Sequence, residues 1–191
     1  TLGGVMAAQR AVQGAGLQIL TETVTSPTLA AQLRALLSRY PAARWHQYEP
    51  AGGDAVRAGT RLAFGEPLNP VYRLDKAAVI LALDADFLHA GPGALRYARE
   101  FAAGRRLTSP ADGMNRLYVV ESMPTPTGAI ADHRLPLRAS DLEGFARALA
   151  RRLRVPGAGD GEAAEAFPQH ARWLDAVAKD LAAHRGAGLV V

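Results

Sequence analysis

The stretch from Leu117 to Phe145, LYVVESMPTPTGAIADHRLPLRASDLEGF, decides the expected fold. Its first residues, LYVVE, form an apolar run that ends in an acidic residue, which is typical of a parallel strand covered on both faces. A polar turn, a second short strand and a helix from Ser140 are expected to follow. Because doubly wound folds hold ligands beyond the carboxyl ends of their strands, Glu121 marks a candidate ligand site.

The segments on both sides of this stretch alternate between strand and helix patterns. The run AAVILAL at 77–83 is too uniformly apolar for an exposed edge and predicts a central parallel strand. Further strands are expected at 17–24, 43–48 and 189–191, and helices at 27–40, 54–64, 95–102, 140–153 and 168–184. Such alternation predicts parallel strands with right-handed crossovers. The expected fold class is therefore α/β, a Rossmann-like parallel sheet with flanking helices.

Changes in composition predict how the chain is divided. The segment RVPGAGDGEAAE at 154–165 is poor in bulky apolar residues, which is typical of a linker. We therefore expect one α/β domain over 1–153, a linker over 154–167, and, over 168–191, a helix and the start of a strand that belong to a following unit. The first residue is Thr1 and the last residues read as a strand, so we expect a fragment of a larger chain.

Composition excludes several classes of function. The chain has 191 residues, of which 49% are hydrophobic and 21% charged, an ordinary balance for a globular protein. It contains no cysteine, so disulfides and thiolate or iron–sulfur sites within it are excluded. Its net charge of +4 comes mainly from arginines that are spread along the chain, which argues against nucleic-acid binding. No apolar run reaches the roughly 20 residues that a membrane helix needs.

Acidic residues follow the expected strands and are the candidate ligand-binding groups. Asp84 and Asp86 come after the central strand, Glu121 ends the next, and Asp141 lies at a helix start. In an open α/β sheet these carboxylates would face one pocket. The alternative is that they are loop carboxylates and helix caps, because the run from Ser140 to Glu143, SDLE, has the spacing of a capping box.

Other catalytic and metal-binding patterns are absent from the sequence. No glycine-rich fingerprint of the GxGxxG or GxxxxGK type follows any expected strand. The histidines are far apart and form no pair at metal-ligand spacing, and no serine lies in a nucleophile elbow. We therefore expect no catalytic residue and no metal ligand in this chain.

The run ADHRLPLRASD at 131–141 resembles a segment of the molybdopterin oxidoreductases, the formate dehydrogenase and DMSO reductase superfamily. In that family an Ala-Asp-x-x-Leu-Pro-Ile-x-Pro-Gly-Thr-Asp run holds the guanine end of the pterin cofactor. The order of strands and helices over about residues 16–153 is similar as well. The resemblance implies cofactor-binding positions at Glu121, Asp132 and Asp141.

The chain departs from that family at the positions that hold the cofactor. A glycine-bearing turn of the family is replaced by Leu83–Asp86, which adds two negative charges where a pyrophosphate would approach. The family's Asp-Pro-Arg after the later strand is replaced by Ser122–Pro124. Residues 41–60, where the metal-ligating Cys, selenocysteine or Ser is expected, contain none of these. We therefore expect a vestigial site without a bound cofactor.

The runs DADFL at 84–88, GPG at 91–93 and MNRLYVVES at 114–122 are most similar to the large iron–sulfur subunit of alternative complex III, a quinol:electron acceptor oxidoreductase. The resemblance implies a cofactor-free N-terminal half, with iron–sulfur clusters in a ferredoxin-like domain further along. It also implies other subunits of a membrane respiratory complex as partners, no nucleic acid, and a peripheral location on the periplasmic face of the bacterial inner membrane.

Three hypotheses about function follow. The first is a scaffold or docking domain of a membrane-associated respiratory oxidoreductase subunit that takes part in quinol oxidation and electron transfer, itself non-catalytic. The second is a fragment of an active oxidoreductase that depends on molybdopterin guanine dinucleotide, with its metal ligand outside these residues. The third is an unrelated nucleotide-binding module that uses the same crevice.

Overall fold

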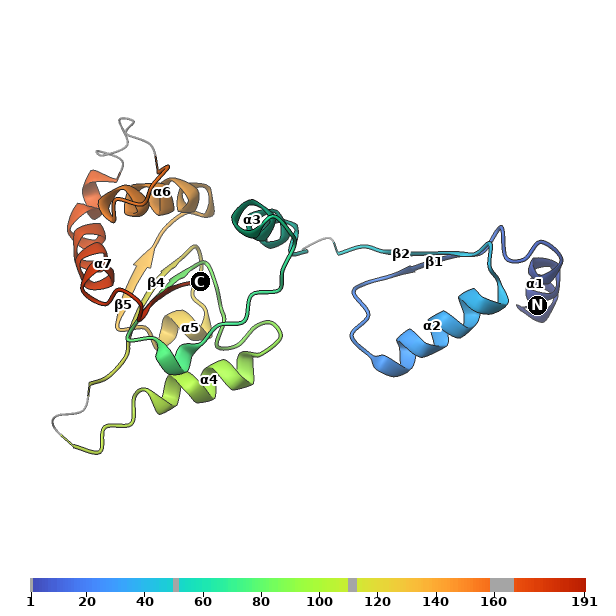
Figure 1. Ribbon diagram of the computed structural model, residues 1–191, viewed down its shortest axis with the longest axis horizontal. Helices are drawn as coiled ribbons and strands as arrows, with labels where there is room; N and C mark the ends of the chain where they lie inside the picture. Colours follow the sequence, from blue (N-terminus) through green and yellow to red (C-terminus); the bar gives the residue numbers. More distant parts are fainter. Residues whose placement is uncertain (1, 50–51, 110–112, 159–166) are drawn as a thin grey trace. The chain divides into compact units, whose positions relative to one another are not determined.

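The computed structural model describes residues 2–49, 52–109, 113–158 and 167–191 (Figure 1). The chain divides into two compact units, an N-terminal unit, Thr1–Pro70, and a C-terminal unit, Val71–Val191. Within the described ranges, no helix is both long enough and apolar enough to cross a membrane.

A four-stranded parallel sheet forms the centre of the C-terminal unit. Its strands run in the order β5-β4-β3-β6. They are β3 (Val79–Leu83), β4 (Arg116–Glu121), β5 (His133–Pro136) and β6 (Gly188–Val190). The two uninterrupted apolar runs, β3 and β4, take the central places, where both faces are covered. The expected Rossmann-like α/β class is thus confirmed.

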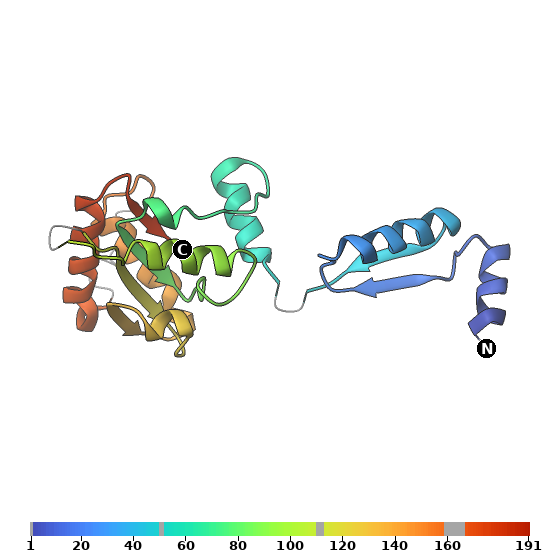
Figure 2. The same ribbon diagram turned by 90° about the horizontal axis from the view of Figure 1, so that it is seen from below.

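Helices cover both faces of this sheet, as Figures 1 and 2 show. On one face, α6 (Leu142–Arg152) and α7 (Ala171–Ala183) pack on Val79 and Leu81 of β3 and on Val120 of β4. On the other face, α4 (Ala94–Ala103) packs on alternate residues of the same strands. The described part of the unit also contains the short helical segments η1 (Leu74–Lys76), α5 (Pro126–Ala129), η2 (Ala139–Asp141) and η4 (Pro168–His170).

The last segment of the chain forms an edge strand of this sheet and does not belong to a following unit. β6 pairs with β3 in parallel, with Ile80 opposite Leu189, and α7 packs on α6. The division of the chain falls after Pro70, not at the expected linker 154–167. Residues 159–166 of that linker lie outside the described residues. The low apolar content of this segment therefore indicates a connection between two helices of one unit and not a boundary between units.

The N-terminal unit is built on a βαβ element. Its strands β1 (Gln18–Thr21) and β2 (Arg44–Gln47) pair in parallel, joined by α2 (Pro27–Arg39). The unit also contains α1 (Leu2–Ala11) and α3 (Asp54–Phe64). The expected helix start is confirmed, because Ser26 Oγ accepts a hydrogen bond of 3.3 Å from the Leu29 amide.

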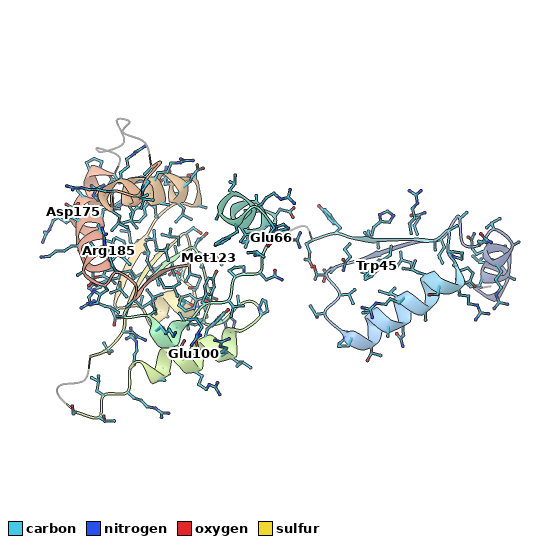
Figure 3. All side chains as sticks on the ribbon, viewed as in Figure 1. Trp45, Glu66, Glu100, Met123, Asp175 and Arg185 are labelled. Carbon is cyan, nitrogen blue, oxygen red and sulfur yellow. The ribbon has the colours of Figure 1, made fainter. Side chains whose placement is uncertain are left out.

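Few hydrophobic side chains are buried in the described part of this unit. Leu33 of α2 and Tyr40 are buried, whereas Leu20 of β1 is 70% exposed. Trp45 of β2, labelled in Figure 3, donates from its indole Nε1 to Thr21 Oγ1 at 3.0 Å and so joins the two strands. The unit therefore has paired strands with little buried surface.

Candidate functional site

The carboxyl ends of β3 and β4 carry the acidic residues that the sequence singled out. Asp84 follows β3 with φ at 53°, a left-handed conformation that Asp adopts more readily than most residues. This turn directs its carboxylate to β4, where Oδ1 accepts from the Ser122 amide at 2.9 Å and from Ser122 Oγ at 3.1 Å. Asp84 therefore connects the ends of the two central strands.

Asp86 is bound to the short helix α5. Its Oδ1 accepts from the Thr127 amide at 3.0 Å and from Thr127 Oγ1 at 2.6 Å. The same hydroxyl oxygen accepts from the Leu88 amide at 3.2 Å, and the Thr127 side chain is fully buried. Asp86 thus fixes the loop after β3 against the helix that follows β4.

Glu121 is completely buried at the end of β4. Arg134 of β5 donates from Nε to its Oε1, and Thr125 donates from Oγ1 to its Oε2 at 2.7 Å. A Cβ atom at Gly128 would overlap the carboxylate, so glycine is the residue that lets α5 lie over it. A buried carboxylate is stable only when its charge is compensated, and here Arg134 supplies the positive charge.

These three carboxylates act as internal acceptors. A phosphate placed beside them would meet negative charge, since the Ser122 and Thr127 amides and hydroxyls and the Nε of Arg134 are already bonded to these carboxylates. A ribose hydroxyl would have to displace Arg134 or Thr125 to reach Glu121. The arrangement is suited to holding two strands, a loop and a short helix together.

Asp132 lies at the opposite, amino end of the sheet. Arg105 donates to both of its oxygens, with 3.0 Å from Nη1 to Oδ1, and the Leu117 amide donates to Oδ2 at 2.8 Å. Burial raises the pKa of Asp132, but the bonds from Arg105 and Leu117 together outweigh it and hold the pKa below its usual range. Asp132 and Glu121 are therefore not brought together.

Asp141 lies in η2, just after the end of β5. Its Oδ1 accepts from Ser140 Oγ at 3.2 Å. The expected capping box is wrong: α6 begins after Asp141, which makes no side-chain cap bond, and Ser140 bonds Asp141 while Glu143 bonds Arg147. A turn of 3₁₀ helix occupies the place of the cap, so the helix starts later than the SDLE pattern indicated.

Two residues of the site were not foreseen from the sequence. Thr125 caps α5, since its Oγ1 accepts from the Gly128 amide at 3.0 Å. A threonine before Pro126 is a recognisable helix start and was available as a signal. Arg134 had no such signal, because its contact with Glu121 depends on the pairing of β4 with β5.

A second polar cluster lies at the amino end of the sheet. Arg116 donates to both oxygens of Asp180, at 2.7 and 2.9 Å, and the Tyr118 hydroxyl donates to Asp180 Oδ2 at 2.9 Å. Burial, followed by the bond to Asp180, raises the pKa of Tyr118 to about 12. The cluster ties α7 to β4 and exposes no free carboxylate.

The positions implied for a pterin guanine dinucleotide do not form one cradle. Glu121 is enclosed, Asp132 lies at the other end of the sheet, and Asp141 contacts Ser140. In the described part of the chain, no three His, Cys, Asp or Glu side chains are placed to hold a metal ion. Glu121, Asp132 and Asp141 are therefore not brought together around one ligand position.

No model of a known protein family matches the chain, and no curated protein matches it.

Proposed function

We propose that the chain is a scaffold and docking domain of a membrane-associated respiratory oxidoreductase subunit that takes part in quinol oxidation and electron transfer. In this proposal it binds no catalytic cofactor, and the chemistry belongs to other parts of the complex. The observation that supports it most is the engagement of Glu121, Asp84 and Asp86 in bonds within the fold.

A ligand at this site would have to replace hydrogen bonds that hold the fold together. A hydrogen bond to a charged group contributes about 1.5–3 kcal/mol, and removing one partner of a buried ion pair costs about 3–5 kcal/mol. A ligand at the end of β4 would have to separate Glu121 from Arg134 or Thr125. Folding contacts, rather than ligand contacts, therefore account for the acidic residues.

In this proposal the chain contacts other parts of a respiratory complex. Its partners would be a ferredoxin-like domain of the same protein, which carries iron–sulfur clusters, and further subunits of a membrane respiratory complex. The complex would lie on the periplasmic face of the bacterial inner membrane. These assignments rest on the family resemblance of residues 84–93 and 114–122.

A fragment of an active oxidoreductase that uses molybdopterin guanine dinucleotide is the second candidate. One observation favours it: Asp141 is partly exposed just beyond β5, at the end of the run that resembles the guanine-binding segment. In that case a metal ligand outside these residues would complete the site. Asp141, rather than Glu121, would then be the residue that meets the ligand.

Metal and pterin analysis of the intact subunit separates the two candidates. We expect no stoichiometric molybdenum, tungsten or organic pterin, and their presence would overturn the scaffold proposal. If the second candidate holds, Asp141→Asn lowers pterin content while the exposed, matched control Glu143→Gln leaves it unchanged. Thermal shift with millimolar GTP and GDP screens for a nucleotide module, because ligand at 100 times Kd adds about 2.7 kcal/mol.

A further inference from the structure

β6 is an edge strand whose outer side pairs with nothing in the described part of the C-terminal unit. Edge strands are usually protected by charged residues, proline or a bulge. The segment GLVV at 188–191 has neither a charged residue nor a proline, and Val190 is 49% exposed. An apolar edge of this kind is suited to pairing with another strand.

The backbone of β6 presents hydrogen-bonding groups on this open side. The carbonyl of Ala187 accepts from the amide of Ala78, just before β3, at 2.8 Å. The Val191 amide donates to Leu81 and the Val191 carbonyl accepts from Leu83, both in β3 and both at 2.9 Å. Because bonding directions alternate along a parallel strand, the N–H and C=O groups of Gly188 and Val190 point outward. Two donors and two acceptors are therefore available to an added strand.

A shallow hollow of about 350 Å³ borders the same edge on the face of α6 and α7. Leu181 and Val190 line its apolar part, and Arg154, His184 and Arg185 add basic groups. Figure 3 labels Arg185, which follows α7. The nearby Asp180 is engaged by Arg116, so the hollow favours acidic side chains.

We propose that β6 is a docking edge at which an extended segment of a partner polypeptide adds as a fifth strand. Alternate side chains of that segment are acidic and lie over the basic hollow. Those between them are apolar and lie on the opposite face, where Leu189 and Val191 contact the core. This inference rests on the proposed docking function and names the surface and the partner chemistry.

The charges favour a different polypeptide over a second copy of the chain. A second β6 carries the same basic groups, Arg154 and Arg185, and would bring positive charge against positive charge. An acidic partner strand satisfies the outward backbone groups and the arginines together.

The test uses amide hydrogen exchange of the isotope-labelled chain, read by NMR at Gly188 and Val190. The probe is a short capped peptide that alternates valine and glutamate, and the matched control replaces glutamate with lysine. We expect the glutamate peptide at saturation to slow exchange at both amides by about tenfold or more. The lysine peptide should bind at least about tenfold more weakly.

Variants of the chain test the two components of the site. Val190→Pro removes an outward donor without removing a bond to β3, and it should abolish peptide binding. Arg154→Glu with Arg185→Glu should weaken the glutamate peptide by about tenfold or more, whereas Arg172→Glu, at the other end of α7, should not. Circular dichroism and Trp173 fluorescence confirm that each variant is folded.

Several results would overturn the inference. If the Gly188 and Val190 amides of the free chain are as protected from hydrogen exchange as the Leu189 amide, the edge is already covered. Equal binding of both peptides, no effect at these amides, or self-association through β6 would each count against it. Failure here is distinct from failure of the proposed function, since pterin in the intact subunit would overturn that function and leave the peptide result unchanged.

Discussion

The two parallel strand pairs, β1 with β2 and β3 with β4, differ in what covers them. Leu81 of β3 is completely buried beneath α6 and α7, whereas Leu20 of β1 is 70% exposed. In sequence, both pairs show the same alternation of strand and helix patterns. Local pattern therefore defines the elements, while the number of covered faces decides how much a residue stabilises the fold.

The polar contacts of the two units differ in the same way. In the C-terminal unit, buried Glu121 bonds Arg134 across two strands. In the N-terminal unit, Asp54 pairs with Arg57 within one helix turn, and both side chains are mostly exposed. Exposed pairs contribute about 0–1 kcal/mol, so the N-terminal unit gains little from its charges.

The largest effect is expected when the same substitution is made in both strand pairs. Leu81→Ala should lower the free energy of unfolding by about 4 kcal/mol, because it leaves a cavity, and Leu20→Ala by less than about 0.5 kcal/mol. Urea titration measures both. Each unit contains one tryptophan, so Trp45→Phe isolates the signal of Trp173, and Trp173→Phe that of Trp45. Similar losses of stability in the two variants would contradict the difference in burial between the strand pairs.

Gly128→Ala tests how tightly the carboxyl end of β4 is packed. The added methyl would overlap the carboxylate of Glu121 and separate it from its partners. We expect a loss of about 3 kcal/mol in urea titration. The control Gly113→Ala has open space around its new methyl and should change stability by less than about 0.5 kcal/mol. A small loss at Gly128 would contradict the close packing.

Asp132→Asn tests the amino end of the same sheet. Its bonds from Arg105 and Leu117 predict a loss of about 2 kcal/mol at neutral pH. The pKa of Asp132 is lowered in the folded state, so its stabilisation is present above the ordinary aspartate pKa of about 4 and is lost as pH falls through the folded value.

The measurement is urea titration at several pH values. The difference between the parent chain and Asp132→Asn should shrink on acidification. Asp175→Asn is the control, because Asp175 pairs with Arg152 at an exposed position and should cost less than about 0.5 kcal/mol. A pH-independent difference would show that the carboxylate charge is not what stabilises this end.

The smallest effect is a gain in the N-terminal unit. Gly59 lies in the middle of α3 with nothing near the place of a Cβ atom. Gly59→Ala should stabilise this helix by about 0.8 kcal/mol through its higher helix propensity. Trp45 fluorescence in urea and helix content by circular dichroism check it. A loss of stability would mean that α3 requires glycine for another reason.

Most of the fold was predictable because its main signals are local. The uninterrupted apolar runs at 77–83 and 117–121 became β3 and β4, and Ser26 before Pro27 began α2 as expected. The place of β6 was not predictable in this way. Its pairing with β3 joins residues about a hundred positions apart, and no local pattern records such a contact.

The position of the candidate site was predictable from the sequence, but the contacts of its residues were not. The sequence placed Glu121 at the end of a strand, but its burial and its bond to Arg134 depend on the register of β4 with β5. Asp132 and Asp141 belong to one linear run, yet β5 lies between them and adds about 3.3 Å per residue. Their short separation in sequence therefore did not indicate that they lie apart in the structure.

The contact between Glu121 and Gly128 also has a consequence for how this fold varies during evolution. The space that a side chain at position 128 would fill is occupied by a carboxylate from position 121. A relative that acquires a larger residue at 128 must shorten the residue at 121, and then Arg134 loses its counter-charge. Substitutions at these three positions should consequently occur together, so that divergent relatives show correlated changes at 121, 128 and 134.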